Sequence, residues 1–191
     1  MRNMAIAAKA IALIVVSTAG VGCAQLSADQ TELAKVHWII GLKEIILAGD
    51  FSNYTNVAKQ LNLDLAAKSP IPVKNVDGAI TGESFDVDTV PPANEENRKK
   101  IQFYYGVYTP SDRSYRRAIL MINNLSLYEC LTESDIFRTF GQIRRTTYAH
   151  SPNYSIDYHF KGDNDIDLLF RFENSSEKCA DQINVFQNRR K

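Results

Sequence analysis

The sequence predicts an α+β fold, with an N-terminal helical pair and an antiparallel sheet of hairpins backed by helices. Two observations predict it. Apolar residues recur at helical spacing within residues 28–65, and after residue 100 they alternate with a period of two. The chain has 191 residues, 45% of them hydrophobic. That is enough for one domain with a buried core, which we assign to residues 25–191.

The first 24 residues are predicted to be a signal peptide and not part of the fold. Arg2 gives a basic start, residues 10–16 are apolar, and small residues close the run, which is the pattern of a secretory signal. Two interpretations of its processing stay open. One is cleavage before Gln25; the other is a lipoprotein leader that ends before Cys23, which would carry the lipid. Both imply export, to the periplasm or the outer membrane of a bacterium.

Export also predicts the state of the cysteines. Cys23 is removed or acylated in either interpretation, which leaves Cys130 and Cys179 in an oxidising compartment. We expect these two residues to form a disulfide bond. It would close a loop of about 50 residues and stabilise the fold by roughly 4 kcal/mol in the chain-entropy model.

The helical pair is predicted within residues 28–65. A capping box at Ser27 begins the first helix, a Gly-Asp pair at residues 49–50 ends it, and Ser52 or Asn53 caps the second. Residues 70–100 hold four prolines and a polar run. We expect a long loop there, with one strand around residues 85–90.

Residues 101–188 are predicted to form the sheet region. Alternating residues 101–108, a turn at Pro110 and residues 115–122 make a hairpin. Thr132 caps a short helix that Gly141 ends. Two more strands follow around a turn at residues 162–164, and residues 183–186 are expected to add an edge strand.

Within residues 131–186, a helix pattern from Leu131 to Gly141 precedes two aromatic strands, with Tyr158 and Phe160 in the first and Phe170 in the second. This run resembles the helix-then-hairpin module of β-lactamase-inhibitor-protein-like domains and of the small outer-membrane assembly lipoprotein. The resemblance implies a sheet that binds protein, and it carries over no functional residue. The chain departs from those families because it has one clear copy of the module, a large N-terminal helical region and a cysteine pair.

The sequence assigns no catalytic residue, cofactor or metal site. It has no Gly-x-Ser-x-Gly elbow and no zinc motif, and the acidic run at residues 163–167 lacks the glycine and glutamate of a calcium loop. Two alternatives stay open. One is a periplasmic hydrolase that uses His150 with Asp157 or Asp135. The other is a carrier that holds an apolar ligand between the helical pair and the sheet.

A partner-binding patch is predicted on the first hairpin. The alternation directs Tyr104 and Tyr108 outward, and the following turn brings Asp112, Arg113 and Tyr115 beside them. The 22 basic and 22 acidic side chains balance, so nucleic acid is not an expected partner, and membrane contact is expected only through an N-terminal lipid. The sequence therefore predicts an exported, non-catalytic envelope protein that binds another protein, as an inhibitor, an immunity protein or an assembly accessory.

Overall fold

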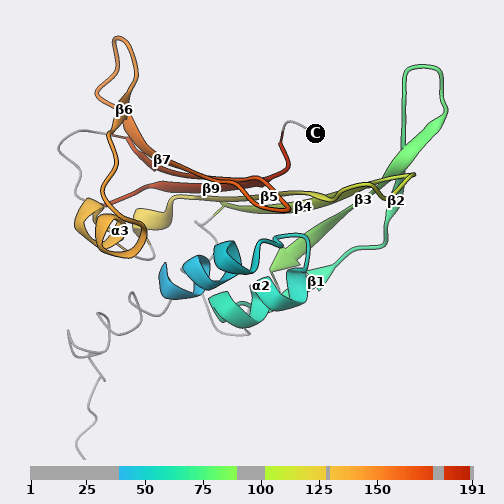
Figure 1. The fold of residues 1–191 in the computed structure, drawn as a ribbon, viewed down its shortest axis with the longest axis horizontal. Helices are drawn as coiled ribbons and strands as arrows, with labels where there is room; N and C mark the ends of the chain where they lie inside the picture. Colours follow the sequence, from blue (N-terminus) through green and yellow to red (C-terminus); the bar gives the residue numbers. More distant parts are fainter. Residues whose placement is uncertain (1–38, 90–101, 128–129, 174–178, 190–191) are drawn as a thin grey trace, which may run out of the picture.

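The computed structural model describes residues 39–89, 102–127, 130–173 and 179–189 (Figure 1). They form a nine-stranded antiparallel sheet with helices on one of its faces, which confirms the predicted α+β class. A helix over residues 39–48 is followed by α2 (Tyr54–Leu61), β1 (Leu65–Ala67), β2 (Ile71–Lys74), β3 (Ile80–Thr89), β4 (Gln102–Pro110), β5 (Arg117–Asn123), the 3₁₀ turn η2 (Leu125–Leu127), α3 (Glu133–Phe140), β6 (Thr146–Thr147), β7 (Tyr154–Phe160), β8 (Ile166–Phe172) and β9 (Gln182–Gln187).

The strands run across the sheet in the order β1-β3-β4-β5-β9-β8-β7-β6, and β2 also pairs with β3. The last strand of the chain is therefore central, between β5 and β8, and the prediction of an edge strand at residues 183–186 is wrong. Alternation identifies which side chains are buried, but it does not say which strands are neighbours.

The prediction of a long loop over residues 70–100 is wrong for residues 71–74 and 80–84, which are in strands, whereas the strand expected around residues 85–90 overlaps the end of β3. β2 and β3 form a hairpin there, and β3 pairs with β4 from Gly82↔Pro110 to Asp86↔Gly106. The prolines suggested a loop, but Pro72 lies on an edge strand, where a missing amide donor is tolerated. Residues 90–100 lie outside the described part.

Two helices lie side by side beneath the middle of the sheet (Figure 1). The Asn53 side chain accepts a hydrogen bond from the Asn56 amide at 3.1 Å and caps α2. α2 ends at Leu61, because Asn62 adopts a left-handed conformation with φ of 50°. Residue 65 is consequently in β1 and not in the predicted helical pair. Residues 1–38, with the predicted signal peptide, Cys23 and the expected start of the first helix, lie outside the described residues.

The loop between these helices is attached to the sheet by one buried residue. The Phe51 amide donates to the Gln187 side-chain oxygen at 2.5 Å, and the Tyr105 hydroxyl donates to the Phe51 carbonyl oxygen. All three residues are at most 1% exposed. Since a buried backbone group without a partner is costly, these two side chains satisfy both polar groups of Phe51 and fix the helices against the sheet. We call this arrangement the Phe51 anchor.

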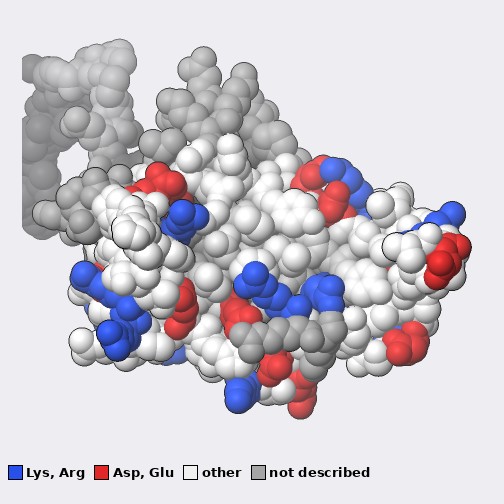
Figure 2. Space-filling model, turned by 90° about the horizontal axis from the view of Figure 1, so that it is seen from above, with Lys and Arg blue, Asp and Glu red and all other residues white. Residues whose placement is uncertain are grey.

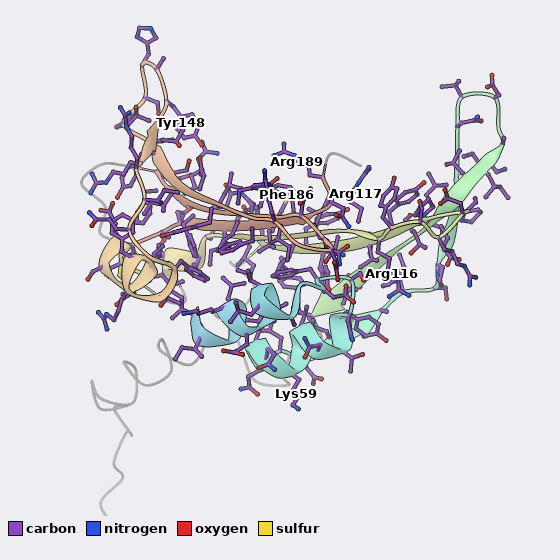
Figure 3. The ribbon with its side chains drawn as sticks, in the orientation of Figure 1. Lys59, Arg116, Arg117, Tyr148, Phe186 and Arg189 are labelled. Atoms are coloured by element: carbon purple, nitrogen blue, oxygen red, sulfur yellow. A yellow bond between two sulfur atoms is a disulfide. The ribbon has the colours of Figure 1, made fainter. Side chains whose placement is uncertain are left out.

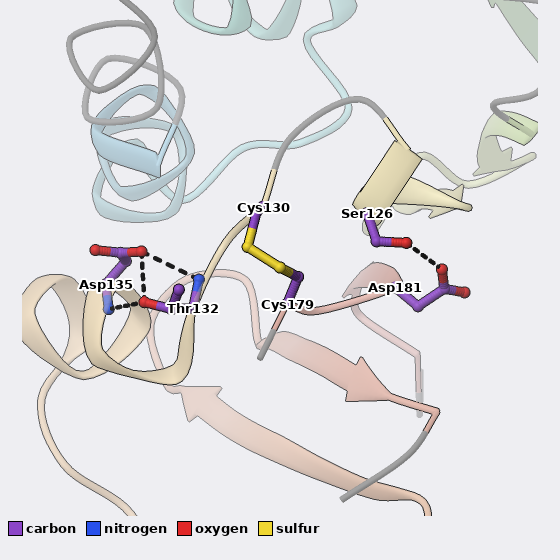
Figure 4. Close-up of a disulfide and its surroundings, with 6 residues drawn as sticks. All are labelled: Ser126, Cys130, Thr132, Asp135, Cys179 and Asp181. Atoms are coloured by element: carbon purple, nitrogen blue, oxygen red, sulfur yellow. Dashed lines mark hydrogen bonds between the residues drawn. A yellow bond between two sulfur atoms is a disulfide. The ribbon is translucent and has the colours of Figure 1, made fainter. Parts of the chain in front are cut away.

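Cys130 and Cys179 form the predicted disulfide bond, with their Cα atoms 4.8 Å apart (Figure 4). The surrounding backbone is also paired, because the Ala180 amide donates to the Leu131 carbonyl oxygen at 2.8 Å. Next to the disulfide, Thr132 and Asp135 form a capping box that begins α3. The disulfide therefore joins the start of α3 to the segment that leads into β9.

Candidate protein-binding face

One face of the sheet is turned away from the helices, and we call it the open face. Side chains alternate between the two faces of a strand, and directly paired residues of antiparallel strands share a face. The pairings therefore place on the open face Tyr104, Tyr108, Arg117, Ile119, Met121, Asp157, His159, Asp167, Leu169, Arg171, Asn184 and Phe186. Their neighbours along the strands, such as Tyr105, Leu120 and Val185, are buried in the core.

The open face lies between two raised ends of the sheet. The loop between β6 and β7 and the β2–β3 hairpin both extend to the side opposite to the helices (Figure 1). Seen from that side, uncharged atoms occupy the middle of the face and a group of basic side chains lies beside them (Figure 2).

Two tyrosines of the open face lie over glycines. A Cβ added to Gly106 would come within 2.8 Å of the Tyr104 hydroxyl oxygen, and one added to Gly82 would come within 2.8 Å of the Tyr108 ring. The Tyr108 hydroxyl also donates to the Thr81 carbonyl oxygen at 3.1 Å. The glycines thus leave room for both rings to lie close to the sheet. The Tyr104 side chain stays 50% exposed.

Arginines stack on the aromatic rings of this side. The Arg117 guanidinium lies 5.7 Å from the Tyr108 ring and 5.8 Å from the Tyr115 ring, while that of Arg189 lies 4.6 Å from the Phe186 ring. Figure 3 shows Arg117, Phe186 and Arg189 above the sheet, with Arg116 and Lys59 on the side of the helices.

At the other end of the face, the Arg171 guanidinium lies 5.8 Å from the Tyr148 ring, and the Tyr148 hydroxyl donates to the Ser155 hydroxyl oxygen at 3.2 Å. Stacked arginine and tyrosine are the residue types that most often carry binding energy at protein interfaces.

The open face also holds carboxylates, among them the exposed Asp86, which shares a cross-strand row with Gly106 and Ile119. His159 Nδ1 lies 2.6 Å from an Asp167 carboxylate oxygen. One side-chain oxygen of Asp157 and one of Asn184 are buried without a hydrogen-bond partner among the described residues. Both flank Leu169 in a single cross-strand row. Apolar side chains, those of Ile119, Met121, Leu169 and Phe186, lie in the same rows as these polar residues.

The predicted patch residues are only partly together. Tyr104, Tyr108 and Tyr115 share the open face, and the Tyr108 and Tyr115 rings are 6.5 Å apart. Arg113 has a left-handed backbone, with φ of 54°, and lines a surface pocket with Thr109, which points to the side of the helices. Arg113 also lines a second pocket with Gly82, the glycine next to the Tyr108 ring, so its place beside the tyrosines stays a prediction.

Asp112 serves the turn itself. Its carboxylate accepts hydrogen bonds from the Ser114 amide at 3.0 Å and the Ser114 hydroxyl at 2.8 Å. These bonds, first of all the one from the amide, lower the pKa of the Asp112 carboxyl. A role for the patch in partner binding stays a prediction.

The alternative catalytic residues are not brought together by any described hydrogen bond or ion pair. His150 lies in the exposed turn between β6 and β7, with φ of 61°. Asp135 caps α3 and pairs with Arg138 at 3.2 Å, and Asp157 lies on β7. The histidine that does pair with a carboxylate is His159. Counting strand register outward from the turn at residues 162–164 would have found this pair.

Among the described residues, no group of three or more acidic, histidine or cysteine side chains is arranged to hold a metal ion. Residues of the acidic run after β7 form hydrogen bonds that hold the turn in place. The Asn164 side-chain amide donates to the Gly49 carbonyl oxygen at 2.8 Å, and the Asp165 backbone amide donates to the Asn188 side-chain oxygen at 3.1 Å. The space between helices and sheet, where a carrier would hold an apolar ligand, is filled by core side chains, among them Leu42, Ile45, Val57, Leu61, Tyr105 and Phe170.

Comparisons with protein-family models, with curated protein sequences and with solved structures find no match to this chain. In the portion of the chain that the structure describes, no helix combines the length and the apolar character needed to cross a membrane.

Proposed function

We propose that this chain is an exported bacterial envelope protein that binds another envelope or exported protein through its open face, without catalysis. The observation that carries the proposal is a sheet face that the described helices leave uncovered and that presents stacked tyrosines and arginines. Large rings held against the sheet lose little entropy on binding, and they offer apolar area together with a hydroxyl.

Export is the second part of the proposal. It rests on the leader-like residues 1–24, with either cleavage before Gln25 or lipidation of Cys23, and on a disulfide bond, which fits an oxidising compartment. The partner is then a protein of the periplasm or the outer membrane. Inhibitor, immunity protein and assembly accessory are the classes proposed, and the resemblance of residues 131–186 to protein-binding modules points the same way. The proposed function involves neither nucleic acid nor a cofactor.

A capture experiment tests the proposal. We expect the tagged protein to retain one stoichiometric partner from periplasmic extract, identified by mass spectrometry. Tyr104→Ala with Ile119→Ala should weaken this binding at least tenfold, because truncating an aromatic anchor commonly costs about 2 kcal/mol or more. The matched control is Leu47→Ala, which removes an exposed apolar side chain from the helix at residues 39–48.

The outcomes separate the alternatives. Loss of the partner in Leu47→Ala and not in the open-face variant would move the interface to the helices. Failure to retain any partner would contradict the proposal. If His150→Ala abolishes biological activity without changing fold or binding, the hydrolase interpretation replaces it.

A further inference from the structure

We propose that two copies of this chain associate through the outer edge of β7, where the two strands pair antiparallel and join the two sheets. This inference goes beyond the proposed function and does not rest on it. It follows from backbone groups that the described chain leaves free along this edge, and from the order of charges beside them.

The outer edge of β7 is covered over only part of its length. β6 pairs with Tyr154 and Ser155 alone, and no other described strand pairs with this side of β7. The segment that leaves α3 contacts β7 from the side of the helices, where the Tyr158 hydroxyl donates to the Gly141 carbonyl oxygen at 2.6 Å. Within the described part of the chain, residues 156–160 therefore have no backbone partner on their outer side.

The hydrogen bonds next to β6 show which residues direct their backbone groups to this edge. The Tyr148 amide donates to the Asn153 carbonyl oxygen at 3.5 Å, so the Asn153 backbone points to the β6 side. Because backbone groups alternate in direction along a strand, those of Asp157 and His159 point outward beyond the end of β6. Both residues are accessible, since Asp157 is half-buried and the His159 side chain is 41% exposed. A second strand can therefore exchange backbone hydrogen bonds with them.

The opposite edge of the sheet is protected against such pairing. There β1 has only three residues, Pro72 has no amide to donate, and the register of β2 shifts between Val73 and Lys74. Short strands, prolines and bulges keep an edge from pairing with another chain. β7 has seven residues, pairs with β8 without a shift, and contains no proline or glycine. Charged side chains can also protect an edge, but those of β7 are arranged to fit a second copy.

The charges along this edge are complementary to themselves. Asp157 lies near one end of the free segment, His159 follows it, and Lys161 comes directly after the strand. When two such edges pair antiparallel about Tyr158, Asp157 of each copy lies opposite His159 of the other and diagonal to Lys161. The like-charged contact in this register, between the two Asp157 carboxylates, is also diagonal, at about 7–8 Å instead of the roughly 5 Å of a direct pair. The attractive pairs are therefore the closer ones.

The side chains of this pair also have unused hydrogen-bonding groups. One oxygen of the Asp157 carboxylate is buried without a partner among the described residues, and no described ion pair joins Asp157 to Arg171 of β8. His159 Nδ1 lies 2.6 Å from the Asp167 carboxylate, and no described contact uses its Nε2. Since buried polar atoms of folded proteins nearly always have a partner, an imidazole from a second copy opposite Asp157 would satisfy both groups.

The contact is small, so the dimer is expected to be weak. Ile156 and Tyr158, on the side of the helices, are at most 7% exposed in one copy and gain little cover from a second. A short strand edge buries less than the about 1,600 Å² of a standard stable interface. We therefore expect a dissociation constant in the micromolar range. Because directly paired residues share a face, the open faces of both copies would lie on the same side of one continuous sheet.

Sedimentation velocity of the purified full chain, from low micromolar to near-millimolar concentration, tests the inference. We expect reversible dimers. Asp157→Arg places an arginine opposite His159 and should weaken association at least tenfold, because the change acts twice in a two-fold dimer. The matched control is Asp86→Arg, which reverses an exposed charge of the open face on β3 and should change the association less than twofold. Equal melting temperatures of the two variants would exclude unfolding as the cause.

A second variant tests the antiparallel arrangement. His159→Glu with Lys161→Glu places carboxylates opposite and diagonal to Asp157, and should also be monomeric by itself. An equimolar mixture with the Asp157→Arg variant should form dimers at least as tight as those of the unchanged chain, because each copy then presents the charge that the other lacks.

Several results would overturn the inference. They are a monomer at every concentration, a dimer that Asp157→Arg leaves unchanged, an equal loss in Asp86→Arg, or charge variants that stay monomeric when mixed. Hydrogen exchange would then identify the true occupant of the edge. Asp157 and His159 amides that are protected in a monomer would assign the edge to another part of this chain, and amides protected only with the captured envelope partner would assign it to that partner.

Discussion

Replacing Tyr105 by phenylalanine tests whether the Phe51 anchor holds the helices on the sheet. The substitution removes one hydroxyl and leaves the ring in place. The Phe51 carbonyl oxygen, which accepts from that hydroxyl, would then be buried without a partner. A buried polar group left unsatisfied costs about 1–3 kcal/mol. For a domain of this size, each 1 kcal/mol lowers the melting temperature by about 2–4 °C.

Gln187→Met perturbs the other half of the anchor with a side chain of similar length. It leaves the Phe51 amide unpaired and also removes the 3.2 Å hydrogen bond from Gln187 to the Arg116 carbonyl oxygen. We expect a further loss of about 1–3 kcal/mol. The double variant should lose less than the sum, because both changes act on one residue and the loop can rehydrate once it is released.

Urea unfolding followed by circular dichroism measures these effects, and Tyr104→Phe is the matched control. Tyr104 is on the same strand, one residue away, but is half-exposed, so removal of its hydroxyl should change stability by less than about 0.5 kcal/mol. Equal free energies of unfolding for the Tyr105→Phe and Tyr104→Phe variants would refute the reasoning.

Three other predictions concern stability. Replacing Cys130 and Cys179 by serine should lower the free energy of unfolding by about 4 kcal/mol, and non-reducing peptide mapping should show the two cysteines linked in the native protein. Burial raises the pKa of the Tyr105 hydroxyl, so above pH 10 this hydroxyl ionises in the unfolded state before it ionises in the folded state. The free energy of unfolding should therefore fall by up to about 1.4 kcal/mol per pH unit. Urea unfolding of Tyr105→Phe at the same pH values should not show this pH-dependent loss. Gly82→Ala should destabilise more than Gly106→Ala in thermal melts, because its Cβ would lie 2.4 Å from a backbone oxygen and the other would meet only a movable tyrosine hydroxyl.

Local features of the fold were predictable from the sequence. The capping box at Thr132 and the alternation of the first hairpin depend on residues close together in the chain, so the pattern contains the information that builds them. The disulfide followed from counting the cysteines of a chain that we expect to be exported.

Features that depend on distant strands were not predictable in this way. The first half of β3 has no strand pattern by itself, because Gly82, Glu83 and Ser84 interrupt it, and it becomes a strand by pairing with β4 on one side and with β2 on the other. The left-handed backbone of Arg113 was not predictable either, because the turn offers no glycine as a signal.

The candidate site depends on the last strand of the chain. β9 separates β5 from β8 and brings Phe186 between Ile119 and Asp167, so the open face is continuous only when β9 is inserted. Three contacts prepare that insertion next to the end of β5: the disulfide, the 2.8 Å bond from the Leu125 amide to the Asp181 carbonyl oxygen, and the 2.9 Å bond from the Ser126 hydroxyl to the Asp181 carboxylate (Figure 4). They place the start of β9 beside the strand with which it must pair. The disulfide therefore stabilises the segment that leads into β9, the strand that joins the two halves of the open face.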